Sequence, residues 1–199
     1  ANRFCLAAIY AENAAGKPLL FGCNLCGECC RQMQVPLSHF DLARLAEAFP
    51  EQSLLNWVRL APIEAEDPDA VRLEQSWRQL CLRNRGPEEG CVFLKDNSCS
   101  IYPHRPSACR TWPLDLNAKG QLEVSPAHHL LYTTACDKTP FKEARPIKRA
   151  LGDNAEEFKA YRRLLKQWNA LSKDKPERQH FEAFWAFLKP FTRPQPELL

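Results

Sequence analysis

Apolar side chains recur at intervals of three and four residues in the N-terminal third of the chain. Ser38 and Asp41 have the spacing of a helix capping box, and Pro50 ends the apolar run that follows. The pattern predicts a helix over residues 38–49 and a shorter helix over residues 51–60. Their apolar faces are Leu42, Leu45, Ala46 and Phe49 in the first helix, and Leu54, Leu55 and Val58 in the second.

A third helix is predicted to begin at Asp67-Pro68. Gly86-Pro87 then breaks the chain, and residues 86–113 are rich in Pro, Gly, Asn, Ser and Cys. We expect little regular structure in that segment. The residues at helical spacing that form the face of the third helix are Ala70, Leu73, Trp77, Leu80 and Cys81.

The C-terminal third carries two more apolar stripes. The first follows Asp153 and has basic residues on the opposite side, and the second begins near Pro176 and stops before Pro190. We expect these two helices to pack as an antiparallel pair, followed by a flexible Pro-rich tail over residues 191–199. The stripes are Phe158, Tyr161, Leu164, Leu165, Trp168 and Leu171, and then Phe181, Phe184, Trp185 and Leu188.

Composition and charge narrow the class of protein. The chain has 199 residues, 45% of them hydrophobic and 26% charged, which suits a globular protein. A net charge of +3 is too small to indicate nucleic-acid binding. No apolar stretch approaches the roughly 20 residues that cross a bilayer, and the stretch after Arg3 is too short for a signal peptide. We therefore expect a cytoplasmic protein that binds neither nucleic acid nor membrane, and leave open whether a segment before Ala1 was removed.

Cysteines provide the chemistry of the sequence. Four of the ten lie within eight residues, in the run FGCNLCGECC, and four more follow at wider spacing. In a reducing compartment such clusters are metal ligands more often than disulfides. Cys5 and Cys81 lie outside the clusters and fit buried structural thiols. The candidate metal ligands are Cys23, Cys26, Cys29, Cys30, Cys91, Cys99, Cys109 and Cys136.

The spacing does not choose between metals. Eight thiolates fill two four-cysteine zinc sites or two four-cysteine iron–sulfur clusters. Cys23, Cys26 and Cys29 have the spacing that grips a 4Fe–4S cubane, although Cys30-Arg31 replaces the Cys-Pro of that pattern. An iron–sulfur cluster is the leading interpretation and zinc the alternative. The doubled cysteine indicates a second metal, a polynuclear centre or one bystander thiol.

These elements predict a mostly α-helical fold, which is α+β with a small hairpin formed by residues 114–116 and 121–124. The cysteine-rich middle is expected to be irregular and clamped by metal, with the N-terminal helices and the C-terminal helix pair packed around it. The predicted units are a metal-binding domain over residues 1–150, the helix pair over 151–190 and the tail over 191–199.

Several polar residues lie next to the cysteines. Arg105 and Arg110 flank Cys109, and a guanidinium there would offset thiolate charge and donate hydrogen bonds. Tyr102 is a further neighbour of the centre, and Tyr102, His104 or His128 would be an acid or base if the centre had an open position. Weaker candidate ligands are His104, His128 and His129.

The run FGCNLCGECC, followed by GCVFLKDNSCSIYPHRPSACRTWP, resembles a family of bacterial proteins. These are the YkgJ-like proteins, which carry a C-x-x-C-x-x-C-C signature and are described as a putative zinc- or iron-chelating domain. The resemblance covers roughly residues 21–136. It implies that the eight clustered cysteines are the metal ligands, and it implies no reaction.

Four functions remain open from the sequence, and one of them is metal storage or delivery, which would need a labile ion. The leading hypothesis is a protein that holds an iron–sulfur or polynuclear centre for electron transfer or redox support, with an unknown protein or redox partner. The alternative is a zinc-stabilised protein-interaction module, in which metal binding contributes to folding. A further alternative is a metalloenzyme with an open metal position, for which the sequence names no substrate.

Overall fold

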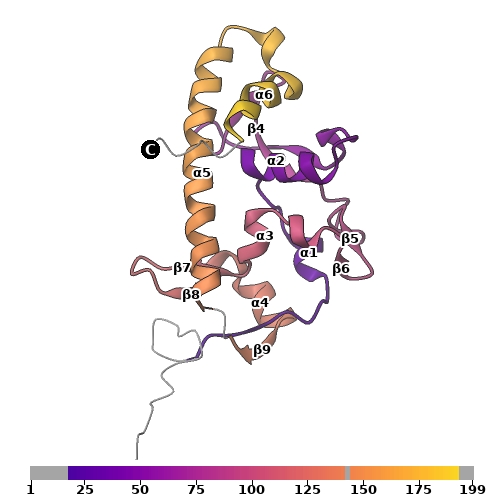
Figure 1. The fold of residues 1–199 in the computed structure, drawn as a ribbon, viewed down its shortest axis with the longest axis vertical. Helices are drawn as coiled ribbons and strands as arrows, with labels where there is room; N and C mark the ends of the chain where they lie inside the picture. Colours follow the sequence, from indigo (N-terminus) through magenta and orange to yellow (C-terminus); the bar gives the residue numbers. More distant parts are fainter. Residues whose placement is uncertain (1–17, 142–143, 193–199) are drawn as a thin grey trace, which may run out of the picture.

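The computed structural model describes residues 18–141 and 144–192, which form an α+β structure (Figure 1). None of the described helices is long and apolar enough to cross a membrane. Within the described residues, the strands pair in four small sheets, with the order β1-β9, β2-β4-β3, β5-β6 and β7-β8. The α-helices are α1 (Glu28–Gln32), α2 (His39–Ala48), α3 (Ser107–Thr111), α4 (His129–Ala135), α5 (Ala144–Ser172) and α6 (Phe181–Leu188). The strands are β1 (Leu20–Gly22), β2 (Val58–Pro62), β3 (Val71–Leu73), β4 (Ser76–Leu82), β5 (Leu94–Lys95), β6 (Ser98–Cys99), β7 (Leu114–Leu116), β8 (Leu122–Val124) and β9 (Asp137–Pro140).

The long helix α5 connects the two apolar cores. Figure 1 shows it along one side of the molecule, with α2 and α6 beside its C-terminal half and α3 and the β7-β8 hairpin beside its N-terminal half. The predicted stripe of α5 is confirmed, except that Leu171 is 54% exposed. The buried stripe residues pack in the larger core, and Leu151 packs in a smaller one with Leu19, Leu114 and Leu122.

Helix α2 forms for the predicted reason. Asp41 N donates to Ser38 Oγ at 3.2 Å, and Ser38 N donates to Asp41 Oδ2 at 2.8 Å, so the capping box is complete. Leu42 and Leu45 are fully buried on the inner face. The hairpin β7-β8 is confirmed as well, with Leu116 opposite Leu122 around the turn.

The helices predicted over residues 51–60 and from residue 67 are wrong. The first segment contains one turn of 3-10 helix (Leu54–Asn56) and then β2, and the second forms the hairpin β3-β4. Apolar residues at spacings of three and four can also come from a strand whose end is buried on both faces. Strand β4 is of this kind, because Leu80, Cys81 and Leu82 at its end are all buried. The turn between β3 and β4 has no glycine signal, because Glu74 and Gln75 themselves adopt φ values of 51° and 59°.

The edge strand β3 is completed by side chains of α5. Asn169 accepts a hydrogen bond from Arg72 N at 2.8 Å through Oδ1, and donates to Ala70 O at 3.0 Å through Nδ2. Trp168 Nε1 donates to Arg72 O at 3.2 Å. These contacts replace the strand neighbour that β3 lacks, and so fix α5 against the three-stranded sheet.

The expectation of a mostly α fold with an irregular, metal-clamped middle is wrong. The structure is 45% helical and 21% strand in several small sheets, and no metal-clamped arrangement is present among the described residues. Phe93 and Ile101 of the middle segment are buried in the larger core, so apolar packing with hairpin and helix hydrogen bonds holds this segment. The division into units at residue 150 stays a prediction, and residues 193–199 of the predicted flexible tail lie outside the described residues.

His39 makes the stability of this fold depend on pH. Its side chain is 1% exposed, between the rings of Phe40 and Tyr161, and burial lowers its pKa to about 4. The unfolded chain therefore binds more protons than the folded protein between about pH 4 and 6.5. We expect the free energy of unfolding to fall by at most about 3 kcal/mol as the pH falls through this window.

Urea unfolding at several pH values measures this effect. His39→Gln removes the titrating group, and should flatten the dependence of the unfolding free energy on pH between 4 and 6.5. The matched control is His104→Gln, which changes a histidine that is exposed. An unchanged slope in His39→Gln would contradict the assignment.

Candidate metal centre

Pairing of β1 with β9 brings the first and last clustered cysteines together. Gly22 lies opposite Asp137 in this antiparallel ladder, so the next residue, Cys23, and the preceding one, Cys136, leave the ladder at the same end. Asn24 Nδ2 donates to Ala135 O at 3.0 Å, and Cys26 Sγ lies 3.8 Å from the same carbonyl oxygen. Backbone structure thus gathers Cys23, Cys26 and Cys136.

Helix α1 supplies Cys29 and Cys30, and Arg31 holds the loop before it. Arg31 Nη1 donates to Cys26 O at 2.9 Å, and Nη2 donates to Asn97 Oδ1 at 2.6 Å. Gly27 has φ 78°, and a Cβ there would lie 2.6 Å from Arg31 Nη1. Glycine at this position therefore permits both the left-handed turn and the close approach of the guanidinium.

A short hairpin places Cys91 and Cys99. Asp96 and Asn97 form its two-residue turn with φ values of 49° and 60°, which sets Cys99 opposite Leu94. Cys91 N donates to Cys30 O at 2.8 Å, so the hairpin is joined by its backbone to α1. The side chain of Asn84 strengthens this junction, since its Nδ2 donates to the same carbonyl at 3.1 Å.

Cys109 lies on α3, which is fixed from behind by Asp41 of α2. Ser107 N, at the start of α3, donates to Asp41 Oδ1 at 2.8 Å. Arg44 pairs with Asp41 at 2.5 Å and with Glu157 of α5 at 2.9 Å. The sequence indicated Asp41 only as a capping residue of its own helix, because the contact with Ser107 spans 66 residues and leaves no local pattern.

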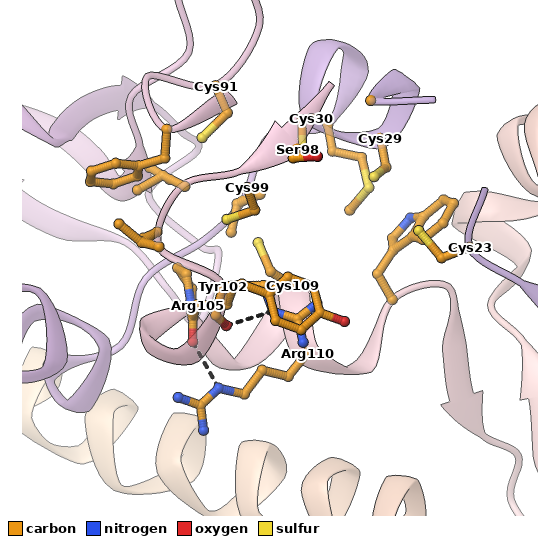
Figure 2. A pocket seen from close by; sticks show the side chains of 18 of the residues that line it. Cys23, Cys29, Cys30, Cys91, Ser98, Cys99, Tyr102, Arg105, Cys109 and Arg110 are labelled. Atoms are coloured by element: carbon orange, nitrogen blue, oxygen red, sulfur yellow. Dashed lines mark hydrogen bonds between the residues drawn. The ribbon is translucent and has the colours of Figure 1, made fainter. Parts of the chain in front are cut away.

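Six of the eight predicted ligands line one cavity of about 640 Å³. Figure 2 shows Cys91, Cys99 and Cys109 directed toward a common space, with Cys29 and Cys30 reaching it from α1 and Cys23 at its edge. Cys26 and Cys136 do not line the cavity. The remaining wall is mainly apolar, and includes Met33, Phe93, Ile101 and Trp112.

Three thiols of this cavity, those of Cys29, Cys91 and Cys109, resist ionisation. The pKa of Cys29 is raised by its hydrogen bond with Cys30 and by burial. Burial is the first cause at Cys109 and Cys91, and neighbouring thiols raise both pKa values further. Burial, with the nearby Cys26, also raises the pKa of Cys136 to about 11. Each thiolate would destabilise the next, and a bound cation would reverse that effect.

The thiols do not converge on a single point. In the part of the chain that the structure describes, no group of three or more His, Cys, Asp or Glu side chains is close enough to hold one metal ion. A zinc ion in a four-cysteine site requires all four sulfurs at about 2.3 Å from its centre. The donor set is chemically suited to soft metals, but its arrangement is wider than a single closed zinc site.

The predicted neighbours of the centre act on the backbone. The Arg105 guanidinium lies 3.5 Å from the centre of the Tyr102 ring, and Arg105 Nε donates to Tyr102 O at 3.0 Å. Arg110 Nε donates to Arg105 O at 2.8 Å. All three residues line the cavity and brace the loop that leads to Cys109. Their influence on a metal centre stays a prediction.

The three candidate histidine ligands lie outside the cavity lining. His104 and His129 are exposed. The ring of His128 is 6.0 Å from that of Trp112, and burial lowers the pKa of His128. Cys81, expected to be structural, is fully buried in β4, and Cys5 lies outside the described residues.

Fold and site define a small α+β protein with a cysteine-lined cavity. Residues 22–129 match the CxxCxxCC family, a putative zinc- or iron-chelating domain. The match covers more than half of the 199 residues, so the chain belongs to this metal-binding family. It includes seven of the eight predicted ligands and ends before Cys136. No curated protein and no solved structure matches the chain significantly.

Exposure and pKa together predict which thiols react. Cys23 is exposed, whereas Cys81 is fully buried and its pKa is raised to about 11. At pH 8 the thiolate fraction of Cys81 is roughly a hundredfold below that of a thiol at the usual value. In metal-free protein treated with iodoacetamide, peptide mass mapping should find Cys23 modified well before Cys81. Equal rates at the two positions would contradict the described burial.

Proposed function

We propose that the protein holds an iron–sulfur or other polynuclear metal centre and uses it in electron transfer or to support a redox reaction. The observation that carries this proposal is the set of six thiols around one largely apolar cavity. A polynuclear centre takes ligands that are further apart than the ligands of a single ion. The spread of the thiols therefore favours it over a closed mononuclear zinc site.

The cysteines divide into two neighbouring groups. Cys29 and Cys99 raise the pKa values of Cys91 and Cys109, and we expect these four cysteines to hold the centre in the cavity. The second group, Cys23, Cys26 and Cys136, is gathered by β1, β9 and the loop before α1. Cys29 influences thiols of both groups, so it lies between them. Cys30, in contact with Cys29, is the remaining candidate ligand.

The walls of the cavity suit a redox centre. An iron–sulfur cluster held by thiolates exchanges single electrons, at a potential set by solvent exposure, charge and hydrogen bonds to sulfur. The chain contributes an aromatic and aliphatic lining that limits water, including Phe93, Ile101 and Trp112. The exposed Cys23 lies at the edge of this lining and would be the side nearest a redox partner protein in the cytoplasm.

Zinc is the second candidate, because the family description names zinc as well as iron. Anaerobic purification followed by measurement of iron, zinc and acid-labile sulfide separates the two. The proposed function requires iron and sulfide together with a visible absorption that bleaches on reduction. A colourless protein with stoichiometric zinc and no sulfide would exclude it.

Substitution of single cysteines tests the ligand assignment. Cys109→Ser should lower iron and sulfide per chain at least severalfold, because a neutral hydroxyl is a poor ligand for iron in such a centre. Cys81→Ser is the matched control, since it changes a buried thiol outside the cavity, and should leave the metal content unchanged. Equal metal content in the two variants would remove Cys109 from the centre.

A further inference from the structure

Asp41 is a buried carboxylate with an unusually complete set of partners. It is 0% exposed, in the first turn of α2. Its oxygens accept hydrogen bonds from Ser38 N at 2.8 Å, Ser107 N at 2.8 Å and Ser107 Oγ at 3.3 Å. Arg44 Nη2 adds an ion pair at 2.5 Å. A buried carboxylate is tolerated only with such compensation, so its position is tightly determined.

The contact with Ser107 fixes the helix that carries Cys109. Helix α3 has five residues, too few to be stable alone, and its N-cap residue, Pro106, makes no side-chain cap hydrogen bond. Asp41 Oδ1 provides that missing acceptor from another helix. Cys109 follows Ser107 by two residues, so the placement of its sulfur in the cavity depends on this anchor.

The same carboxylate acts electrostatically on the cavity. Asp41 contacts Ser107 of the helix that carries Cys109, and Cys109 lines the cavity, so the charge of Asp41 lies close behind the cavity wall. Arg44 bridges Asp41 to Glu157, so the network behind α3 contains two carboxylates and one guanidinium. Negative charge near a buried centre opposes the addition of an electron to it.

We propose that Asp41 is a positioning residue of the metal centre, which fixes Cys109 through Ser107 and lowers the reduction potential of the centre through its buried charge. This inference rests on the proposed function. Glu157, whose side chain is 20% exposed and which contacts Arg44 rather than α3, plays the smaller part in both effects.

Three variants of the full chain separate charge from position. Asp41→Asn removes the charge and keeps the size, whereas Asp41→Glu keeps the charge and displaces the carboxylate. Asp69→Asn is the matched control, because Asp69, like Asp41, pairs with an arginine (Arg162 of α5, at 2.7 Å) and does not line the cavity. Each protein is reconstituted anaerobically with ferrous iron and sulfide, and metal content, midpoint potential and thermal unfolding are measured.

The expected results differ between the variants. Asp41→Asn should lose iron to a chelator severalfold faster than the unsubstituted protein, and its midpoint potential should move in the positive direction. Asp41→Glu should lose iron faster but keep a potential near the original one. Asp69→Asn should match the unsubstituted protein in the rate of iron loss and in midpoint potential, even if the unfolding temperature of this variant falls. If Asp41→Asn does not fold, Ser107→Ala tests the anchor by removing the Oγ contacts only, with faster iron loss expected.

Two different failures can be told apart. If the unsubstituted protein gives an iron–sulfur signal and Asp41→Asn matches it in iron loss and potential, the role of Asp41 is overturned and the proposed function stands. If the unsubstituted protein takes up only zinc, the proposed function and the effect on potential both fail. Zinc loss to a chelator then decides the positioning role, which is overturned if Asp41→Asn releases zinc at the original rate.

Discussion

The buried carboxylate of Asp41 joins the elements that form the core to the segment that carries the cysteines. Its partners come from α2 and α3, and Arg44 extends the network to Glu157 of α5. Removal of a carboxylate from water costs several kcal/mol, which these donors must offset together. An arrangement of this kind tolerates little displacement of α3. The site at Cys109 is therefore as rigid as the packing of α2 and α5, although α3 itself is only five residues long.

Backbone hydrogen bonds position the other cysteines, as Asp41 positions Cys109. The β1-β9 ladder gathers Cys23 and Cys136, and the hydrogen bond from Cys91 N to Cys30 O joins α1 to the second hairpin. None of these contacts uses a thiol. The chain can therefore bring its thiols together before a metal binds, which agrees with the apolar packing of the middle segment.

Local signals predicted the elements that local physics determines. The capping box at Ser38, the apolar stripe of α5 and the β7-β8 hairpin are each encoded within a few residues. The β3-β4 hairpin is not, since its turn places Glu74 and Gln75 at positive φ without glycine. Glu74 N donates to Gln179 O at 2.5 Å, so a distant segment supports this turn. The apolar spacing of the β3-β4 segment fits a helix as well as a hairpin. Only the burial of β4 on both faces, seen in the structure, distinguishes the hairpin from the helix.

The candidate site divides in the same way. Clustered thiols are a chemical signal in themselves, and six of the eight thiols that the spacing indicated line the cavity. Their arrangement could not be predicted from spacing, since Asp41, Asn84 and Arg31 contact Ser107, Cys30 and Asn97 across long stretches of sequence. The histidines show that nearness in sequence does not imply nearness in space. His104 and His129 are close in sequence to Cys109 and Cys136, but neither histidine lines the cavity.

Repulsion between neighbouring thiolates connects the arrangement of the cysteines with their ability to bind metal. The hydrogen bond between Cys30 and Cys29, together with burial and neighbouring sulfurs, raises the pKa values of Cys29, Cys91 and Cys109, so these three thiols stay protonated near neutral pH in the metal-free protein. A metal must displace these protons to bind, which makes binding stronger as the pH rises. The charge of the metal then replaces the repulsion with attraction, and the apolar wall strengthens that attraction by excluding water. The features that make the empty thiols poor acids are thus the ones that would make the loaded centre tightly held.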